Sequence, residues 1–244
     1  MTRNESIRFV ALQTLGNFLV LFSIYGVFAT FGPAIGEQIK YTVIQIRGVE
    51  FNVTNATESI ELTSSSEPIE VTPEPEQQQI GFAEILAGNK EQVLTPKDPL
   101  FSILIPKIGA SSKVIPNVDP GNSEVYLPVL KEGIAHAKGS VFPGYPGNTY
   151  LFAHSADNWW DVGHYNAVFY TLNNLSEKDE IVVFFENRRY NYQVKQKLIA
   201  DPEDVSYLTK QQEGQHQLVL QTCWPPGTTW KRLYVIAELK NTQQ

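Results

Sequence analysis

Two hydrophobic patterns divide the chain. Residues 15–36 contain no charged side chain, and Asn17 is their main polar interruption. As a helix these residues would extend roughly 33 Å at about 1.5 Å per residue, enough to cross a hydrocarbon core of about 30 Å. From residue 98 onward, short apolar runs alternate with turn residues, which is the pattern of β-strands. The sequence therefore predicts a transmembrane helix and a β-rich domain.

The charges that flank the apolar segment predict its orientation. Arg3 and Arg8 precede it, whereas Glu37 and Lys40 follow it and cancel. The positive-inside rule places residues 1–14 in the cytoplasm and the rest of this single-pass chain outside the cell membrane. A cleaved signal peptide is the alternative. Its apolar region would usually be shorter and end in small residues, which "VFATFG" does not match.

The segment after the apolar helix differs in composition from both neighbours. Residues 37–56 alternate apolar and polar side chains, which predicts one or two short strands. Residues 57–79 are rich in Ser, Thr, Pro, Glu and Gln, so they predict an extended, disordered stalk. We therefore assign residues 37–97 to an extracytoplasmic linker and residues 98–240 to the β-rich domain.

The negative charge of the chain belongs to this linker. The formal net charge is −7, yet eight glutamates and no Lys or Arg lie between Arg47 and Lys90. Without those glutamates the chain would be close to neutral. An acidic chain of this kind is not expected to bind nucleic acid.

The β-rich domain contains about eight predicted strands and few helices. A single closed barrel or a sandwich is the economical architecture for so many short strands. The fold class is therefore mainly β. The strand candidates are residues 100–106, 112–118, 133–140, 149–155, 217–223 and 232–239, together with a hairpin over residues 180–200.

Cys223 is the only cysteine, and it closes the strand candidate in "LVLQTCWPPG". A lone cysteine cannot form an intrachain disulfide. In an exported chain it is either buried and inert or kept for its reactivity. The thiolate is the nucleophilic form, and a neighbouring His or Arg stabilises it. The thiol alone leaves both interpretations open.

Among the four histidines, His154 has the position that best matches Cys223. It ends the apolar run "YLFAHS" just before polar loop residues. His136 lies within a shorter strand candidate, whereas His164 and His216 lie in polar, loop-like surroundings. His154 and Cys223 both lie at strand ends, and an imidazole can accept the proton of a thiol. His154 is therefore the candidate base.

A cation opens the last strand candidate. Arg232 follows Cys223 by nine residues, across the connection "WPPGTTWK". If the two strands are neighbours, its guanidinium reaches the thiol and suits a developing oxyanion. Lys231 lies beside it, and since strand side chains alternate faces, only one of these two cations can point at the sulfur.

Together these residues resemble the sortase family of cysteine transpeptidases. "LVLQTC", Arg232 and "NTYLFAHS" match the family's TLxTC-like strand, its downstream arginine and its histidine at a strand end, with Val219 in place of the first threonine. "ILIPKIGASSKVIPNV", "KGSVFPGYPGN" and "LSEKDEIVVFF" extend the likeness over residues 98–240. The motif "TCWPPG" and the Cys-to-Arg spacing are closest to the class D and E sortases.

This resemblance implies that the domain is an eight-stranded sortase-type barrel and that the protein is an enzyme. Cys223 would attack an LPxTG-like sorting signal between Thr and Gly and form a thioacyl-enzyme. His154 would act as general acid and base, and Arg232 would stabilise the oxyanion and the substrate. Thr222 and Val205 would contact the signal. The partners would be proteins with a C-terminal sorting signal and an amine acceptor, either a peptidoglycan stem peptide or a pilin lysine.

Two other functions remain open at the level of sequence. A secreted cysteine peptidase would use the same thiol and histidine but transfer the acyl group only to water. A non-catalytic barrel would bind peptides without needing the thiol. The acidic residues show no recognisable ligand spacing, so we predict no required metal or other cofactor.

Overall fold

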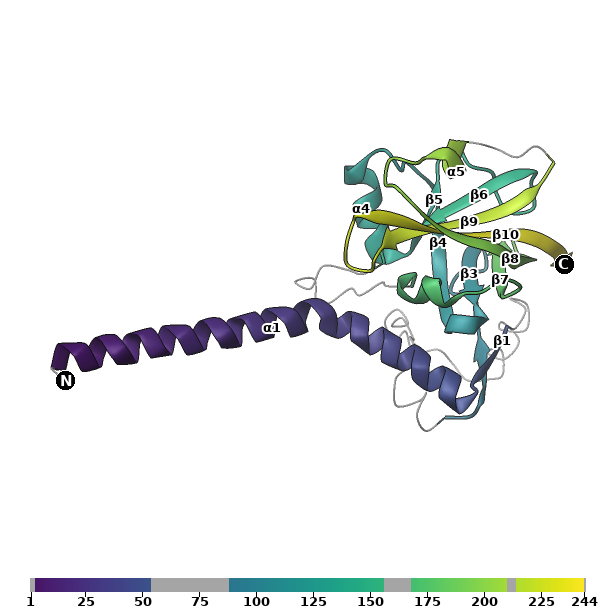
Figure 1. The fold of residues 1–244 in the computed structure, drawn as a ribbon. Helices are drawn as coiled ribbons and strands as arrows, with labels where there is room; N and C mark the ends of the chain where they lie inside the picture. Colours follow the sequence, from purple (N-terminus) through teal and green to yellow (C-terminus); the bar gives the residue numbers. More distant parts are fainter. Residues whose placement is uncertain (1–2, 54–87, 156–167, 210–213, 244) are drawn as a thin grey trace, which may run out of the picture.

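The computed structural model of the chain describes residues 3–53, 88–155, 168–209 and 214–243. The predicted disorder of residues 57–79 lies outside these ranges. The described part consists of a long N-terminal helix and a barrel at its C-terminal end (Figure 1).

Eight strands form a closed barrel in the order β10-β8-β7-β3-β4-β5-β6-β9. The predicted mainly β, eight-stranded barrel is therefore confirmed. Closure pairs each of these eight strands on both sides, so the barrel itself has no free sheet edge. The strands are β3 (Phe101–Ile105), β4 (Ala110–Val118), β5 (Ile134–Ala137), β6 (Gly147–Phe152), β7 (Glu180–Phe185), β8 (Arg188–Ala200), β9 (His216–Trp224) and β10 (Lys231–Gln243).

Short helices lie in the connections between strands. Helix α4 joins β4 to β5, and its N-cap Asn122 accepts a hydrogen bond from the amide of Glu124 through its side chain. This cap satisfies one of the free amides of the first helical turn. The helical connections are η1 (Pro106–Ile108), α4 (Ser123–Glu132), η2 (Tyr170–Asn174) and α5 (Ser206–Thr209).

Strand alternation sends apolar side chains to both sides of the barrel wall. In β9, Leu218 and Leu220 belong to the interior cluster, whereas Val219 belongs to a cluster on the outer face. Successive side chains on a strand point to opposite faces. The outer cluster continues onto Leu130 of α4 and is joined by Leu208 of α5. One wall of the barrel is therefore apolar on both sides and is partly covered by short helices.

Helix α1 (Arg3–Arg47) corrects the prediction for the start of the linker. Residues 37–47 are helical, and strand structure begins at β1 (Glu50–Val53), which pairs in parallel with β2 (Glu91–Leu94). The alternating pattern at 37–47 also places apolar residues three positions apart, which suits a helix face. Packing of this face on the barrel favours the helix.

A glycine ends α1. Gly48 adopts a φ of +61°, a left-handed conformation that glycine adopts without steric cost. Its amide donates to the carbonyl of Gln45, and the amide of Val49 donates to the carbonyl of Ile44 at 3.0 Å. This pair of bonds is a Schellman cap, which stops the helix and turns the chain into β1.

The N-terminal part of α1 has the length and composition of a membrane span. The stretch Arg3–Phe28 has a mean hydropathy of 1.6, and the rest of the protein buries none of it. It overlaps the predicted span over residues 15–36 and begins nearer the N-terminus. This apolar, uncovered helix supports membrane anchoring.

The C-terminal part of α1 is fixed to the barrel through a third apolar cluster. Ile44 of α1, together with Val49 and Phe51 just after the helix, packs with Val182 and Phe184, which are outward-facing residues of β7. Ile44 is only 2% exposed. The helix and the barrel are therefore joined by packed side chains as well as by the chain itself.

We predict that Ile44→Ala weakens this joint. Truncating a fully buried isoleucine removes apolar contacts and leaves a cavity, which typically costs about 2–5 kcal/mol. Chemical unfolding of the full chain in detergent measures the loss. The matched control is Ile46→Ala, two residues away and 80% exposed, which we expect to leave the unfolding free energy unchanged. Equal effects of the two variants would contradict the packing described here.

Candidate active site

The register of three strands brings the predicted site residues into one row. Cys223 of β9 lies opposite Arg232 of β10. On the other side of β9, Phe152 of β6 pairs with Gln221. His154 follows Phe152 by two residues, as Cys223 follows Gln221. Because side chains repeat every two residues, all three face the same side of the wall, and all three line one groove.

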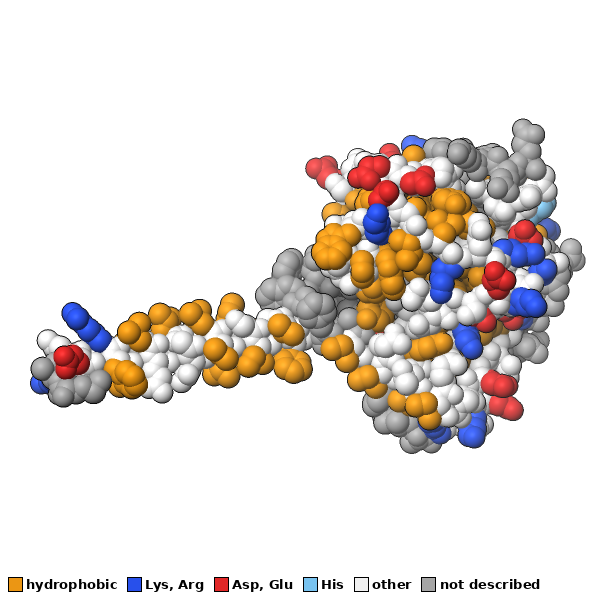
Figure 2. All heavy atoms as spheres, in the orientation of Figure 1, with side chains coloured by type: hydrophobic (Ala, Val, Ile, Leu, Met, Phe, Trp, Pro, Cys, Tyr) orange, Lys and Arg blue, Asp and Glu red, His pale blue; other side chains and the backbone are white. Residues whose placement is uncertain are grey.

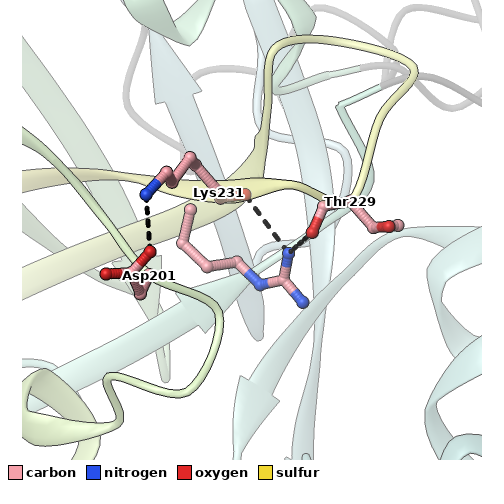
Figure 3. Close-up of polar contacts among 4 residues, drawn as sticks. Asp201, Thr229 and Lys231 are labelled. Atoms are coloured by element: carbon pink, nitrogen blue, oxygen red, sulfur yellow. Dashed lines mark hydrogen bonds and ion pairs between the residues drawn. The ribbon is translucent and has the colours of Figure 1, made fainter.

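The guanidinium of Arg232 lies against the sulfur. Its Nη1 is 3.6 Å from Sγ of Cys223. The same nitrogen donates to the carbonyls of Thr229 and Lys231, each at 3.2 Å, and Figure 3 shows both contacts. These backbone acceptors hold the charged group at the mouth of the β9–β10 connection. The guanidinium is thus placed where a negative charge on sulfur or on a bound oxygen would form.

Lys231 is directed to a different partner. Its Nζ forms an ion pair with Asp201 at 2.5 Å (Figure 3). Asp201 begins the connection from β8 to α5. Of the two neighbouring cations that the sequence offers, the arginine is therefore the one beside the thiol, and the lysine anchors a wall of the groove.

The residue before His154 is tied to β9 on both sides. The amide of Ala153 donates to the carbonyl of Gln221 at 3.2 Å, and the carbonyl of Ala153 accepts from Oγ1 of Thr222 at 3.0 Å. Thr222 is only 1% exposed. These bonds extend the β6–β9 pairing past the last strand residue and fix the backbone from which His154 enters the groove.

The groove has a volume of about 440 Å³ and lies on the outer face of the barrel. Tyr150 and Phe152 of β6, with Gln221 of β9 and Tyr234 of β10, form its floor, because they occupy the same face as the site residues. Figure 2 shows hydrophobic side chains gathered on the barrel between α4 and α5. The groove therefore suits an extended apolar segment that ends at Cys223.

Two elements form the side walls of the groove. Helix α4 contributes Leu127 and Leu130, and the connection from β8 to α5 contributes Val205. The hydroxyl of Tyr234 donates to the carbonyl of Asp204 at 3.0 Å, and Oδ1 of Asp204 accepts from the amide of Ser206. Tyr234, in the floor of the groove, therefore holds in place the side wall that contains Val205.

The thiol is harder to ionise than a free cysteine. Burial raises the pKa of Cys223, and the nearby charge of Arg232 lowers that pKa by a smaller amount. The resting sulfur is therefore mainly the protonated thiol near neutral pH. A nucleophilic role requires a partner that accepts this proton, and the groove brings His154 to the same face.

The other described histidines have structural surroundings. His136 is fully buried and stacks on Phe142, with ring centroids 4.6 Å apart. Its Nδ1 accepts from the amide of Asn117, its Nε2 lies 3.2 Å from the carbonyl of Val141, and burial lowers its pKa. His216 lies at the opposite end of β9 from Cys223. His164 lies outside the described residues.

The structure thus gathers four of the five residues singled out from the sequence. Cys223, His154, Arg232 and Val205 line the groove. Thr222 does not, because it points inward and its hydroxyl is used by Ala153. Sequence reasoning missed the floor, although Gln221 and Phe152 precede Cys223 and His154 by the two-residue strand period that could have identified them.

Among the described residues, metal ligands do not gather in this groove. Across the described ranges, no three His, Cys, Asp or Glu side chains lie together as a metal site would require. Among the described lining residues, the polar side-chain groups are the thiol, the imidazole, the guanidinium, the amide of Gln221 and the hydroxyls of Tyr150, Thr229 and Tyr234. Burial raises the pKa of both tyrosines, so each stays a neutral hydroxyl.

Comparison with known proteins identifies the family. The model of the Sortase domain matches residues 103–240, more than half of the chain. This chain belongs to the sortase family.

Relatives of the chain carry the same family name. Sortase D of Bacillus subtilis (strain 168) is 27% identical over 121 residues, which is 50% of this chain and 52% of that protein. The chain therefore spans about half the length of this curated relative.

Solved sortase structures are similar to part of the chain. A Clostridium perfringens Sortase D5 transpeptidase is 24% identical with a TM-score of 0.47, over 59% of this chain and 80% of that one. Sortase C-1 from Actinomyces oris is 25% identical with a TM-score of 0.49, over 59% and 76%.

The pH dependence of thiol alkylation tests the electrostatics of the site. Because burial places the pKa of Cys223 above its usual range, we expect the rate of reaction with iodoacetamide to keep rising above about pH 8.5, the pKa of a free cysteine. Arg232→Gln removes the charge that lowers this pKa, so the curve should move to higher pH. Mass spectrometry follows the reaction at the single cysteine.

Lys231→Gln is the matched control for this experiment, since its ammonium is paired with Asp201. Its alkylation curve should lie close to that of the wild type. A curve that moves to lower pH in Arg232→Gln, or moves equally in both variants, would contradict the contact between Arg232 and the thiol.

A second prediction concerns Thr222 as a positioning residue. Thr222→Val keeps the shape but leaves the buried carbonyl of Ala153 without its donor, which costs about 1–3 kcal/mol. We expect lower stability and a lower kcat with KM nearly unchanged, because the backbone that holds His154 loosens. Thr222→Ser should restore both. Wild-type kcat in a folded Thr222→Val variant would rule out this role.

Proposed function

We propose that the protein is a membrane-anchored cysteine transpeptidase. It would cleave an LPxTG-like sorting signal between Thr and Gly and transfer the new acyl group to an amine. The observation that supports this most directly is the convergence of Cys223, His154 and Arg232 on one groove, with the guanidinium 3.6 Å from the sulfur. Membership of the sortase family agrees with this proposal.

The first half of the reaction is acylation. Sγ of Cys223 attacks the threonine carbonyl while His154 takes the thiol proton. A sulfur–carbon bond forms, and the carbonyl oxygen becomes negative in the tetrahedral intermediate. Arg232 faces that oxygen with a permanent positive charge. The carbon–nitrogen bond then breaks, and His154 returns its proton to the departing glycine amine.

The second half of the reaction is transfer. An acceptor amine attacks the thioester carbonyl, His154 removes a proton from its nitrogen and passes it to the sulfur, the sulfur–carbon bond breaks, and Cys223 leaves as the thiol. A new amide bond is formed. The acceptor would be an amine of the cell envelope, in a peptidoglycan stem peptide, or a lysine of a pilin subunit. With water as the acceptor, the same steps give hydrolysis.

The groove offers separate places for the parts of a sorting signal. The apolar residues of α4 and the floor suit the leucine and proline of the signal, with Val205 on the facing wall. The threonine carbonyl would lie at the end of the groove, beside Cys223 and Arg232. This order places the leaving glycine toward the β9–β10 connection.

The decisive experiment separates transfer from hydrolysis. The full chain in detergent is incubated with labelled LPxTG-like peptides, varied at their first and third positions, in the presence of hydroxylamine. We expect a hydroxamate product and its loss in Cys223→Ala, because the thioacyl-enzyme can no longer form. Mass spectrometry identifies the products.

The other outcomes point to the alternatives. Free acid alone, at hydroxylamine concentrations that trap thioesters, would support a peptidase that only hydrolyses. Peptide binding without cleavage, unchanged in Cys223→Ala, would support a non-catalytic barrel. Either result would refute the proposed transferase.

A further inference from the structure

A cavity of about 520 Å³ lies at the end of the barrel remote from Cys223. Gly147 and His216 pair where β6 and β9 begin, and Cys223 follows His216 by seven residues, roughly 23 Å of extended strand. Phe142 and Tyr145, in the connection before β6, line this end cavity, which shares no lining residue with the groove. Cavities of this size are typical of small-molecule sites.

Aromatic rings from three segments form the inner wall of the end cavity. Phe142 stacks on Phe185 with ring centroids 4.9 Å apart, and Phe101 meets Phe185 edge to face at 5.0 Å. Phe101 is 4% exposed and belongs to the interior cluster, against which the other two rings pack. The inner wall is therefore the end of the barrel core, and it is held by the same packing.

A buried histidine fixes two of the segments around the end cavity. The ring of His136 lies against Phe142, and its Nδ1 accepts from the amide of Asn117, a lining residue on β4. Its Nε2 lies 3.0 Å from Oγ of Ser140, two residues before Phe142. One imidazole thus ties the β4 side of the end cavity to the aromatic side. The shape of the cavity is therefore set before any ligand arrives.

Two carboxylates are held at the rim through one backbone unit. The amide of Leu100 donates to Oδ1 of Asp98 at 2.8 Å, and the carbonyl of Leu100 accepts from the amide of Glu186 at 3.0 Å. Asp98, Leu100 and Glu186 all line the end cavity. The rim therefore presents two acidic side chains beside the aromatic wall.

The charge of this rim is not balanced by its neighbours. Neither Asp98 nor Glu186 forms an ion pair with another described residue. Lys97 and Arg188 lie close to them in the chain but do not line the end cavity, and no described lining residue is Lys or Arg. A cation is attracted both by carboxylates and by the faces of aromatic rings. The lining therefore complements a ligand that is apolar and positively charged.

We propose that the end cavity binds a small organic cation. Its ammonium group lies between Asp98 and Glu186, and its apolar body lies against the aromatic wall and Tyr145, which is 62% exposed at the opening. This site needs neither the thiol nor the groove, so it goes beyond the proposed function. Because the two sites share no residue, both can be occupied at once.

Three probes with the same body and different charge test the proposal. Phenylpropylammonium, phenylpropanol and phenylpropanoate are titrated into the full chain in detergent, and isothermal calorimetry measures binding after subtraction of the heat in detergent alone. We expect saturable binding that is tightest for the ammonium and weakest for the carboxylate. Equal affinity for the ammonium and the alcohol, or tighter binding of the carboxylate, would overturn the proposal.

Single-charge variants locate the ammonium group. Asp98→Asn keeps an acceptor for the amide of Leu100, and Glu186→Gln keeps its own backbone contact, so both should fold. Each should bind phenylpropylammonium several-fold more weakly and phenylpropanol as the wild type does. Glu177→Gln is the matched control, because this exposed residue lies before β7 whereas Glu186 follows it. An equal loss in all three variants would show attraction to the overall charge and refute the site.

Two further measurements separate the end cavity from the groove. Tyr145→Leu removes the aromatic face at the opening and should weaken binding of the ammonium, whereas Tyr145→Phe should preserve it. Alkylation of Cys223 with iodoacetamide blocks the end of the groove and should leave the affinity unchanged. Loss of binding after alkylation would place the probe in the groove and overturn the proposal. Binding of the probe is measured without turnover, so failure of the proposed transferase would leave this result standing.

Discussion

The site depends on the register among β6, β9 and β10. Cys223 and Arg232 lie opposite each other in one ladder, and Phe152 pairs with Gln221 in the next. A slip of one residue in either ladder would send its side chains to the opposite face of the barrel. The guanidinium or the imidazole would then point into the packed interior. The apolar residues of the barrel interior resist such a slip, so the core that folds the barrel also assembles the site.

The position of Cys223 on the outer face of the barrel explains why its pKa is raised. Placed on an outer face that is partly covered by α4 and α5, Cys223 is half-buried, and burial raises its pKa. The charge of Arg232 opposes that shift without overcoming it. The raised pKa keeps the sulfur mainly as the less reactive thiol. The same environment strengthens the contact between Arg232 and any negative charge that forms during a reaction.

Strand-end chemistry made much of the site predictable from the sequence. Cys223, His154 and Arg232 stood out because each begins or ends an apolar run, and strand ends meet at the rim of a barrel. Which of Lys231 and Arg232 faces the thiol depends on strand pairing, which the sequence does not specify. The inward direction of Thr222 likewise depends on strand pairing. Its neighbours in the motif do not reveal that Ala153 needs its hydroxyl.

The course of α1 was harder to predict than the barrel. Residues 37–47 alternate in a way that suits a strand, yet the same residues present Tyr41 and Ile44 on one helix face. Only contact with the barrel decides whether these residues form a strand or a helix. The cluster that receives Ile44 lies on β7, whereas the groove lies on β6, β9 and β10.

In the closed strand order, β9 at the centre of the groove lies opposite β3, and the anchor cluster spans β3 and β7 through Leu104, Val182 and Phe184. The barrel therefore uses one outer wall for its anchor and the opposite one for its site. The anchoring helix holds the barrel without covering the groove. Side chains alternate between the two faces of each strand, so β7 and β9 each direct apolar residues both inward and outward. This alternation provides the interior core, the anchor contact and the floor of the site.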